Sequence, residues 1–285
     1  MLTCLKVGTS TPFTQTNQSG RLLVFAGGDP EGRVLLSGRA LTYLRIMHRF
    51  ANPLRYQRIA DAILPWAGGC AVVLTVAGLY LALVVAPPDY QQGEAYRIIY
   101  VHVPAAWMAL MVYGMMAVAS AIGLVWRHPL AEIAARAAAP IGAAFTAVAL
   151  FTGSVWGKPM WGTFWVWDAR LTSVLILLFL YLGYIALHDA FDPSRGARAA
   201  SILCLVGSIN LPIIKFSVDW WNTLHQPSSI LRAGGLAVHG SMLVPLLVMF
   251  GAFLCYFVAV HILRTRAELT ERKIRNLRLS ADPPA

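Results

Sequence analysis

The sequence predicts an all-α integral membrane protein, a bundle of six transmembrane helices with both termini in the cytoplasm. Of its 285 residues, 58% are hydrophobic and only 13% are charged, whereas a typical soluble domain carries about 25% charged residues. The mean hydropathy is +0.61. The charged residues cluster between long uncharged runs, whereas a soluble protein with a large apolar core would carry them more evenly.

Six apolar runs account for the predicted spans. A spanning helix needs about 20 apolar residues, within a range of about 17–25. The fifth run is the shortest, and we expect Lys215 at its end to reach outward. The six runs cover residues 62–87, 98–126, 137–157, 171–187, 199–214 and 233–263.

The second run is longer than a bilayer requires. Trp107 and Trp126 should mark its two interfaces, because Trp favours the headgroup level, and their spacing spans roughly 28 Å at about 1.5 Å per residue. This places His102 just above the membrane, about one turn before the helix proper. Pro104 then suits the first turn of that helix.

The distribution of positive charge predicts the orientation. One set of connecting segments, which includes both ends of the bundle, carries fourteen Lys and Arg residues, and the other set carries five. Because Lys and Arg collect in cytoplasmic loops, residues 87–101, 157–170 and 215–234 should form the outer loops. The same bias explains the net charge of +10, and no basic run interleaved with aromatic residues suggests nucleic-acid binding.

The chain divides into three predicted parts. Residues 1–46 are rich in Gly, Ser and Thr, have no helical or strand period and lack the features of a signal peptide, so we expect a disordered extension. Met47 is an alternative start, which would make this extension an artefact of the assigned start site. Residues 47–264 should form the six-helix domain, and residues 265–285 a basic cytoplasmic tail.

Tryptophans gather in the predicted outer loops. The stretch WGKPMWGTFWVWD holds four of the nine tryptophans, and two adjacent ones lie in the third outer loop. An interfacial belt explains single tryptophans, but it explains poorly so many rings within one loop that ends in a carboxylate. We interpret them as an apolar aromatic surface for a flat ligand such as a macrocycle, with an unusually dense belt as the alternative. The residues are Trp156, Trp161, Trp165, Trp167, Asp168, Trp220 and Trp221.

Two histidines flank this loop in sequence, His102 before it and His225 after it. A lone loop histidine is usually a polar surface residue. Haem iron, however, takes imidazole as an axial ligand, and imidazoles from two loops could close both faces of one iron. We expect His239 to be structural, and the remaining histidines to lie on the cytoplasmic side.

Haem propionates also require cations nearby. Asp168 is close in sequence to Arg170 and is expected to orient the loop by a hydrogen bond or ion pair rather than to contact iron. Each Lys or Arg at the outer face is a candidate partner of the propionates, although it could instead be an anchor at the membrane interface. The candidates at the outer face are Arg97, Lys158, Arg170, Lys215 and Arg232.

Several other classes of site are missing from the sequence. The four cysteines form no CxxC pair, so neither a redox motif nor a zinc site is indicated. The chain has no GxxxxGK[ST] phosphate loop, which excludes ATP hydrolysis of that type. Proton-coupled transporters typically carry a run of Asp, Glu or Lys across a span. No predicted span of this chain contains such a run.

The stretch WGKPMWGTFWVWDARLTS resembles the tryptophan-rich WWD signature of haem-handling membrane proteins. The stretches YRIIYVHVPAAW and NLPIIKFSVDWWNTLHQPS resemble the CcmC family of haem-transfer proteins in cytochrome c maturation. The resemblance runs from about Met47 to the C-terminal tail. It implies that His102 and His225 are the two axial ligands of haem b, and that the tryptophan loop with Asp168 binds the ring.

The resemblance also implies a function and its partners. Such a protein lies in the bacterial inner membrane, holds haem at the periplasmic face and passes it to the haem chaperone CcmE, beside the small membrane protein CcmD and an ATP-binding cassette of CcmA and CcmB. It is a haem-delivery protein rather than an enzyme. The alternatives are a haem exporter or permease subunit of an ATP-driven transporter, and an enzyme that ligates haem to apocytochrome c. Ligands at the outer surface favour delivery.

Overall fold

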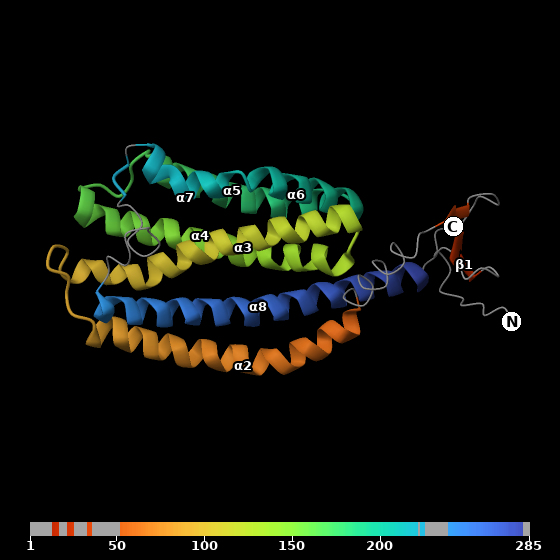
Figure 1. The fold of residues 1–285 in the computed structure, drawn as a ribbon, viewed down its shortest axis with the longest axis horizontal. Coiled ribbons are helices and arrows are strands. Elements are labelled where there is room, and N and C mark those ends of the chain that lie inside the picture. The colour runs from red at the N-terminus through yellow and green to blue at the C-terminus, as the bar shows by residue number, and fades with distance from the viewer. Residues whose placement is uncertain are drawn as a thin grey trace. The chain divides into compact units, whose positions relative to one another are not determined.

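The computed structural model describes residues 13–16, 22–25, 33–35, 52–221, 223–225 and 239–281. Within these ranges, six helical segments are long and apolar enough to cross a membrane, which confirms the predicted fold class (Figure 1). Each of them contains or overlaps one of the predicted runs. The segments are Pro53–Val85, Glu94–Trp126, Pro129–Trp161, Ala169–Ala190, Pro193–Trp220 and Gly240–Arg278.

The individual elements refine these spans. The first span is α2 continued by a π-helical turn, η1, and the second is a 3-10 turn, η2, that runs directly into α3. The bounds are α2 Pro53–Tyr80, η1 Leu81–Val85, η2 Glu94–Ile98, α3 Ile99–Trp126, α4 Pro129–Trp161, α5 Ala169–Ala190, α6 Pro193–Gly207, α7 Asn210–Trp220 and α8 Gly240–Ala281.

The fifth span is broken in its middle, which the sequence analysis did not anticipate. Helix α6 ends at Gly207 and α7 begins at Asn210. The hydroxyl of Ser208 donates to the carbonyl of Leu205 at 2.6 Å, and the side-chain amide of Asn210 donates to the carbonyl of Ser173 on α5 at 2.8 Å. The first bond lies at the break itself, and the second attaches the start of α7 to α5.

Helix α8 is longer than the sixth predicted run and continues to Ala281. Much of the segment predicted as a basic tail is therefore helical. Ion pairs attach this extension to α4: Arg272 contacts Glu132 at 2.5 Å, and Glu268 contacts Arg136 at 3.4 Å.

The N-terminal extension contains three short strands, β1 Phe13–Thr16, β2 Leu22–Phe25 and β3 Arg33–Leu35. They form an antiparallel sheet in the order β1-β2-β3. No regular structure was predicted here, because strands of three or four residues are too short to show a clear period. The rest of residues 1–46, and the disorder predicted for it, lie outside the described residues.

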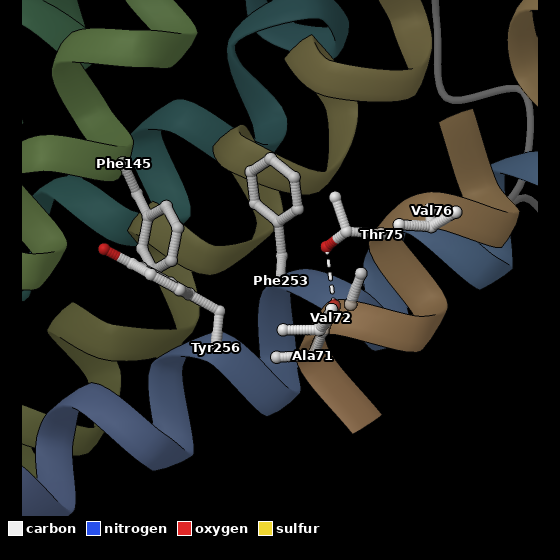
Figure 2. A pocket seen from close by; sticks show the side chains of 8 residues that line it. Ala71, Val72, Thr75, Val76, Phe145, Phe253 and Tyr256 are labelled. Carbon is white, nitrogen blue, oxygen red and sulfur yellow. Dashed lines mark hydrogen bonds between the residues drawn. The ribbon is translucent and has the colours of Figure 1, made fainter. Parts of the chain in front are cut away.

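Five helices of the bundle form one group, and the other two lie beside it. Helices α3, α4, α5, α6 and α7 lie together, and α8 lies between this group and α2 (Figure 1). Between α2, α4 and α8 an apolar cavity of about 430 Å³ is lined by residues such as Val72, Phe145 and Tyr256 (Figure 2). None of the predicted site residues lines this cavity.

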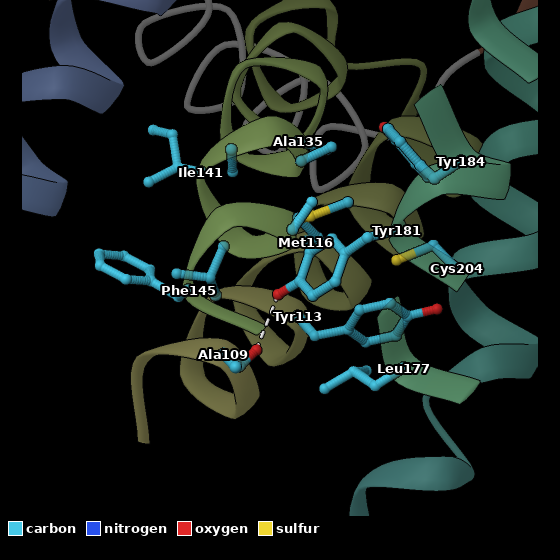
Figure 3. Close-up of a cluster of buried hydrophobic side chains, with 14 of the residues drawn as sticks. Ala109, Tyr113, Met116, Ala135, Ile141, Phe145, Leu177, Tyr181, Tyr184 and Cys204 are labelled. Atoms are coloured by element: carbon cyan, nitrogen blue, oxygen red, sulfur yellow. Dashed lines mark hydrogen bonds between the residues drawn. The ribbon is translucent and has the colours of Figure 1, made fainter. Parts of the chain in front are cut away.

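Two buried tyrosines, Tyr113 and Tyr181, fill the centre of the group formed by α3, α4, α5, α6 and α7 (Figure 3). The hydroxyl of Tyr181 on α5 donates to the carbonyl of Ala109 on α3 at 2.7 Å. Both tyrosines need glycines opposite them: a Cβ at Gly142 would lie 2.3 Å from the Tyr181 ring, and one at Gly207 would lie 2.2 Å from the Tyr113 hydroxyl. Small residues that allow such close approach are typical of helix packing in membranes.

Candidate functional site

A cavity of about 950 Å³ lies at one end of the bundle, among α3, α4, α5, α7 and α8. Its volume is at the upper end of the range of about 300–1,000 Å³ that is typical of small-molecule sites. Both predicted ligand histidines, His102 and His225, line this one cavity.

His102 lies on α3 and not in a loop before it, so its predicted position is wrong. The helical turn begins at Glu94 and continues without a break through Ile99. The start of the turn is fixed by Tyr96, whose hydroxyl donates to the carbonyl of Pro87 at 2.7 Å. Helical structure therefore begins before His102, and the ligand candidate is carried by a rigid element.

The His102 ring is enclosed by one turn of α4. Its Nδ1 lies 3.1 Å from the hydroxyl of Thr152, and its ring meets the Trp156 ring edge-on at 5.7 Å between centroids. A Cβ at Gly153 would lie only 2.9 Å from Cε1 of the imidazole. The absence of a side chain at Gly153 thus allows the ring to pack against the helix backbone.

His225 follows α7 and is held by the carboxylate of Asp168. Its Nδ1 lies 3.1 Å from Oδ2 of Asp168, and its ring contacts the Trp161 ring at 4.9 Å between centroids. Burial lowers the pKa of His225 below its usual value, although the bond with Asp168 acts in the opposite direction. A neutral imidazole is the form that binds iron.

The carboxylate also fixes which nitrogen of His225 carries the proton. A carboxylate oxygen only accepts hydrogen bonds, so Nδ1 must donate to Asp168 and Nε2 keeps its lone pair. The other oxygen of Asp168 accepts from the backbone N–H of Leu171 at 2.7 Å and caps α5. Asp168 therefore contacts His225 with one carboxylate oxygen and caps α5 with the other.

The tryptophans divide into two groups. Trp156 and Trp161 line the cavity, and Nε1 of Trp156 donates to the side chain of Gln92 at 3.0 Å. The other four are not among the residues that line it. Trp167 is 75% exposed and meets Trp165 edge-on, and Trp220 and Trp221 are also exposed. Of the six tryptophans that the sequence analysis assigned to one aromatic surface, two line the cavity.

Two of the candidate cations, Arg170 and Lys215, line the cavity. Arg170 joins α5 to α7, because its Nε donates to the hydroxyl of Ser217 at 3.2 Å and its terminal nitrogen donates to the carbonyls of Ile214 and Lys215 at 3.3 Å.

The other candidates are engaged elsewhere or lie outside the described residues. Arg97 contacts Glu94 and the carbonyl of Ala82, and Lys158 donates to the carbonyl of Gly162 at 3.0 Å. Arg232 lies in the range 226–238, which the structure does not describe.

Gln92 and Thr152 were not singled out from the sequence. Thr152 lies four residues before Trp156, so the two share a helical face, which would have been a usable signal. Their contacts with a distant histidine or tryptophan depend on how the spans pack. Over the described ranges, no group of three or more His, Cys, Asp or Glu side chains could hold a metal ion. A pair of imidazoles instead suits a metal that arrives with its own equatorial ligands.

The fold and the site together define a six-span membrane protein with a tryptophan- and histidine-lined cavity at one end of its bundle. The family model described as "Heme exporter protein C" matches residues 46–280. The chain belongs to this family, CcmC, as the sequence resemblance had predicted.

Curated relatives match the sequence of this chain over most of their own length. The chain is 57% identical over 230 residues to "Heme exporter protein C" of Bradyrhizobium diazoefficiens, a match covering 80% of this chain and 87% of the relative. It is 51% identical over 223 residues to the protein of that name from Escherichia coli (78% and 90%). It is 55% identical over 193 residues to "Putative cytochrome c biosynthesis ccmC-like mitochondrial protein" of Marchantia polymorpha (68% and 82%).

Proposed function

We propose that this protein binds haem as its cargo through His102 and His225 and passes it to the periplasmic haem chaperone CcmE during the biogenesis of c-type cytochromes. The observation that carries the proposal is that both imidazoles line one cavity, each with Nδ1 at hydrogen-bond distance from a polar side chain. Metal-ligating histidines commonly have their second nitrogen bonded in this way. The chain then delivers haem without itself catalysing a reaction.

The chemistry of the cavity suits haem b. Two neutral imidazoles are a common axial pair for haem iron, and the rings of Trp156 and Trp161 lie beside them. Arg170 and Lys215 supply positive charge on the α5 and α7 side of the cavity, where the propionates would lie. The remaining lining is largely apolar, with residues such as Leu110 and Phe250.

The other four tryptophans have a different role in this proposal. Trp165, Trp167, Trp220 and Trp221 do not line the cavity. Trp167, Trp220 and Trp221 are exposed, and exposed aromatic groups are common at membrane interfaces and at binding surfaces. We assign them to the outer face of the haem-binding loop, where the chaperone would approach the bound ring.

The orientation follows from the charge distribution. Along the sequence, fourteen Lys and Arg residues lie in the segments predicted to be cytoplasmic, against five in the segments predicted to face outward. By the positive-inside rule, this distribution supports a cavity at the periplasmic face of the bacterial inner membrane and both termini in the cytoplasm. Family membership supports CcmD and the CcmA and CcmB cassette as partners, in addition to the lipid bilayer.

A haem exporter or permease subunit is the second candidate, since the relatives are named heme exporters. The packing beneath the cavity favours delivery. Ala109 and Leu177 line the cavity, and directly behind them the Tyr181 hydroxyl is bonded to the Ala109 carbonyl within a fully buried cluster. A route for haem through the bundle would have to open this packing.

The test is transfer between purified components. The full chain, loaded with haem in detergent, is mixed with purified apo-CcmE, and haem on each protein is followed by absorption after separation. Delivery predicts transfer without nucleotide or the cassette proteins. A strict requirement for ATP and the cassette would instead favour the exporter.

A further inference from the structure

The hydroxyl group of Thr152 contacts the ring nitrogen of His102 across the interface between α3 and α4. The Thr152 oxygen lies 3.1 Å from Nδ1 of the imidazole. It also lies 2.7 Å from the carbonyl of Val148 and 3.3 Å from that of Ala149, both on its own helix.

These distances fix the direction of the hydrogen bond. A hydroxyl has one proton, and threonines within helices commonly donate it to a carbonyl one turn earlier. The Thr152 proton therefore goes to Val148, the closer acceptor, and its oxygen accepts the Nδ1 proton of His102.

We propose that Thr152 is a positioning residue for His102, which keeps the proton on Nδ1 and so presents an unprotonated Nε2 to the cavity. The inference rests on the proposed function, in which Nε2 of His102 binds the haem iron. It assigns to Thr152 the part that Asp168 has for His225, with a neutral acceptor in place of a carboxylate.

The neighbours of Thr152 hold the ring in register with this acceptor. Gly153 leaves room for the imidazole, and Trp156 packs against its side. Nε1 of Trp156 in turn donates to the side chain of Gln92, in the segment between η1 and η2. Residues 152, 153 and 156 thus form one turn of α4 whose shape fits the His102 ring in a single orientation.

The test compares substitutions that keep or remove the hydroxyl. Thr152→Val has nearly the same shape but no acceptor, and Thr152→Ser keeps the acceptor. Thr146→Val is the matched control, because Thr146 lies on the same helix and donates to the carbonyl four residues earlier at 2.7 Å without contacting a histidine. Each full-length variant is purified in detergent and titrated with haem, followed by its absorption spectrum.

For Thr152→Val we expect haem affinity to fall about tenfold, at the low end of the roughly 10–100-fold effect of such supporting contacts, because the lost acceptor is a neutral hydroxyl. The spectrum should change from six-coordinate low-spin to high-spin, and added imidazole should restore it. Thr152→Ser and Thr146→Val should match the wild type. If Thr152→Val does not accumulate, Thr152→Ala serves as the variant without an acceptor.

Wild-type affinity and spectrum in Thr152→Val, alongside a loss of ligation in His102→Ala, would overturn the role of Thr152 and leave the proposed function intact. Equal losses in Thr152→Ser and Thr152→Val would also overturn it, because the hydroxyl would then not be the cause. An unchanged spectrum in His102→Ala would contradict both the proposed function and this inference.

Discussion

Replacing Asp168 by Asn separates the two tasks of this side chain. In the wild type one carboxylate oxygen accepts from the Leu171 N–H at 2.7 Å and the other accepts from Nδ1 of His225 at 3.1 Å. An amide has only one oxygen, so Asn can satisfy only one of these donors. We expect it to keep the cap of α5, since a neutral imidazole can move its proton between nitrogens whereas the backbone N–H cannot.

The amide nitrogen would then face His225 as a donor. His225 would have to accept at Nδ1 and carry its proton on Nε2, the nitrogen that is needed for iron. Loss of such a supporting contact typically lowers metal affinity about 10–100-fold, which corresponds to about 1.4–2.8 kcal/mol at about 1.4 kcal/mol per tenfold change. The cost in unfolding free energy should be small, because Asn and Asp are about equally good N-caps.

Asp168→Ala is the matched comparison. It removes the cap as well, at a cost of about 0.5–2 kcal/mol, but leaves the His225 imidazole free to choose its proton position. Haem titration and thermal unfolding of the two variants should therefore rank them in opposite orders: Asn should bind haem more weakly, and Ala should unfold more easily. Haem binding by Asp168→Asn at wild-type affinity would refute the assignment of the Nδ1 proton.

Three further predictions test other parts of the account. Gly153→Ala should weaken haem binding by roughly tenfold or more, because its Cβ would lie 2.9 Å from His102, whereas Gly114→Ala, whose Cβ meets Leu211 at 3.9 Å, should bind haem normally in the same titration. Trp161→Ala should retain part of its haem through the two histidines but transfer less to CcmE, whereas Trp167→Ala, with its ring 75% exposed, should titrate like the wild type; complete loss of haem from Trp161→Ala would make the tryptophans the primary binding element. Deleting residues 1–46 should leave membrane insertion and haem binding intact, as fractionation and spectroscopy would show, and failure of the shortened chain to accumulate in the membrane would reveal a role for this segment.

The spans were predictable because hydropathy and charge are local properties of the sequence. Two pairs of positive residues, Arg97 with Arg127 and Arg136 with Lys158, were enough to delimit apolar runs that the structure places in α3 and α4. The break between α6 and α7 was not predictable, because it is stabilised by Asn210 reaching Ser173 on another helix. The position of His102 was misjudged because Trp107 was taken to mark the start of the helix, whereas the helical turn begins at Glu94.

The candidate site was predictable in its residue types but not in its contacts. The sequence predicted that His102, His225 and the tryptophan loop form one site, because all three fall in predicted outer segments. It did not distinguish Trp161, whose ring packs on His225, from Trp167, which does not line the cavity. Contacts such as Thr152 with His102 join residues that are fifty positions apart, and only the packing of α3 on α4 creates them.

The most direct test of the central claim is the absorption spectrum of haem bound to His102→Ala and His225→Ala, with and without added imidazole. We expect each variant to lose the six-coordinate low-spin spectrum and to regain it when imidazole replaces the missing ligand. His239→Ala is the control, because His239 contacts Ser241 and does not line the cavity, and its spectrum should equal that of the wild type. Wild-type spectra in both His102→Ala and His225→Ala would contradict the assignment of the two histidines as the ligands of haem.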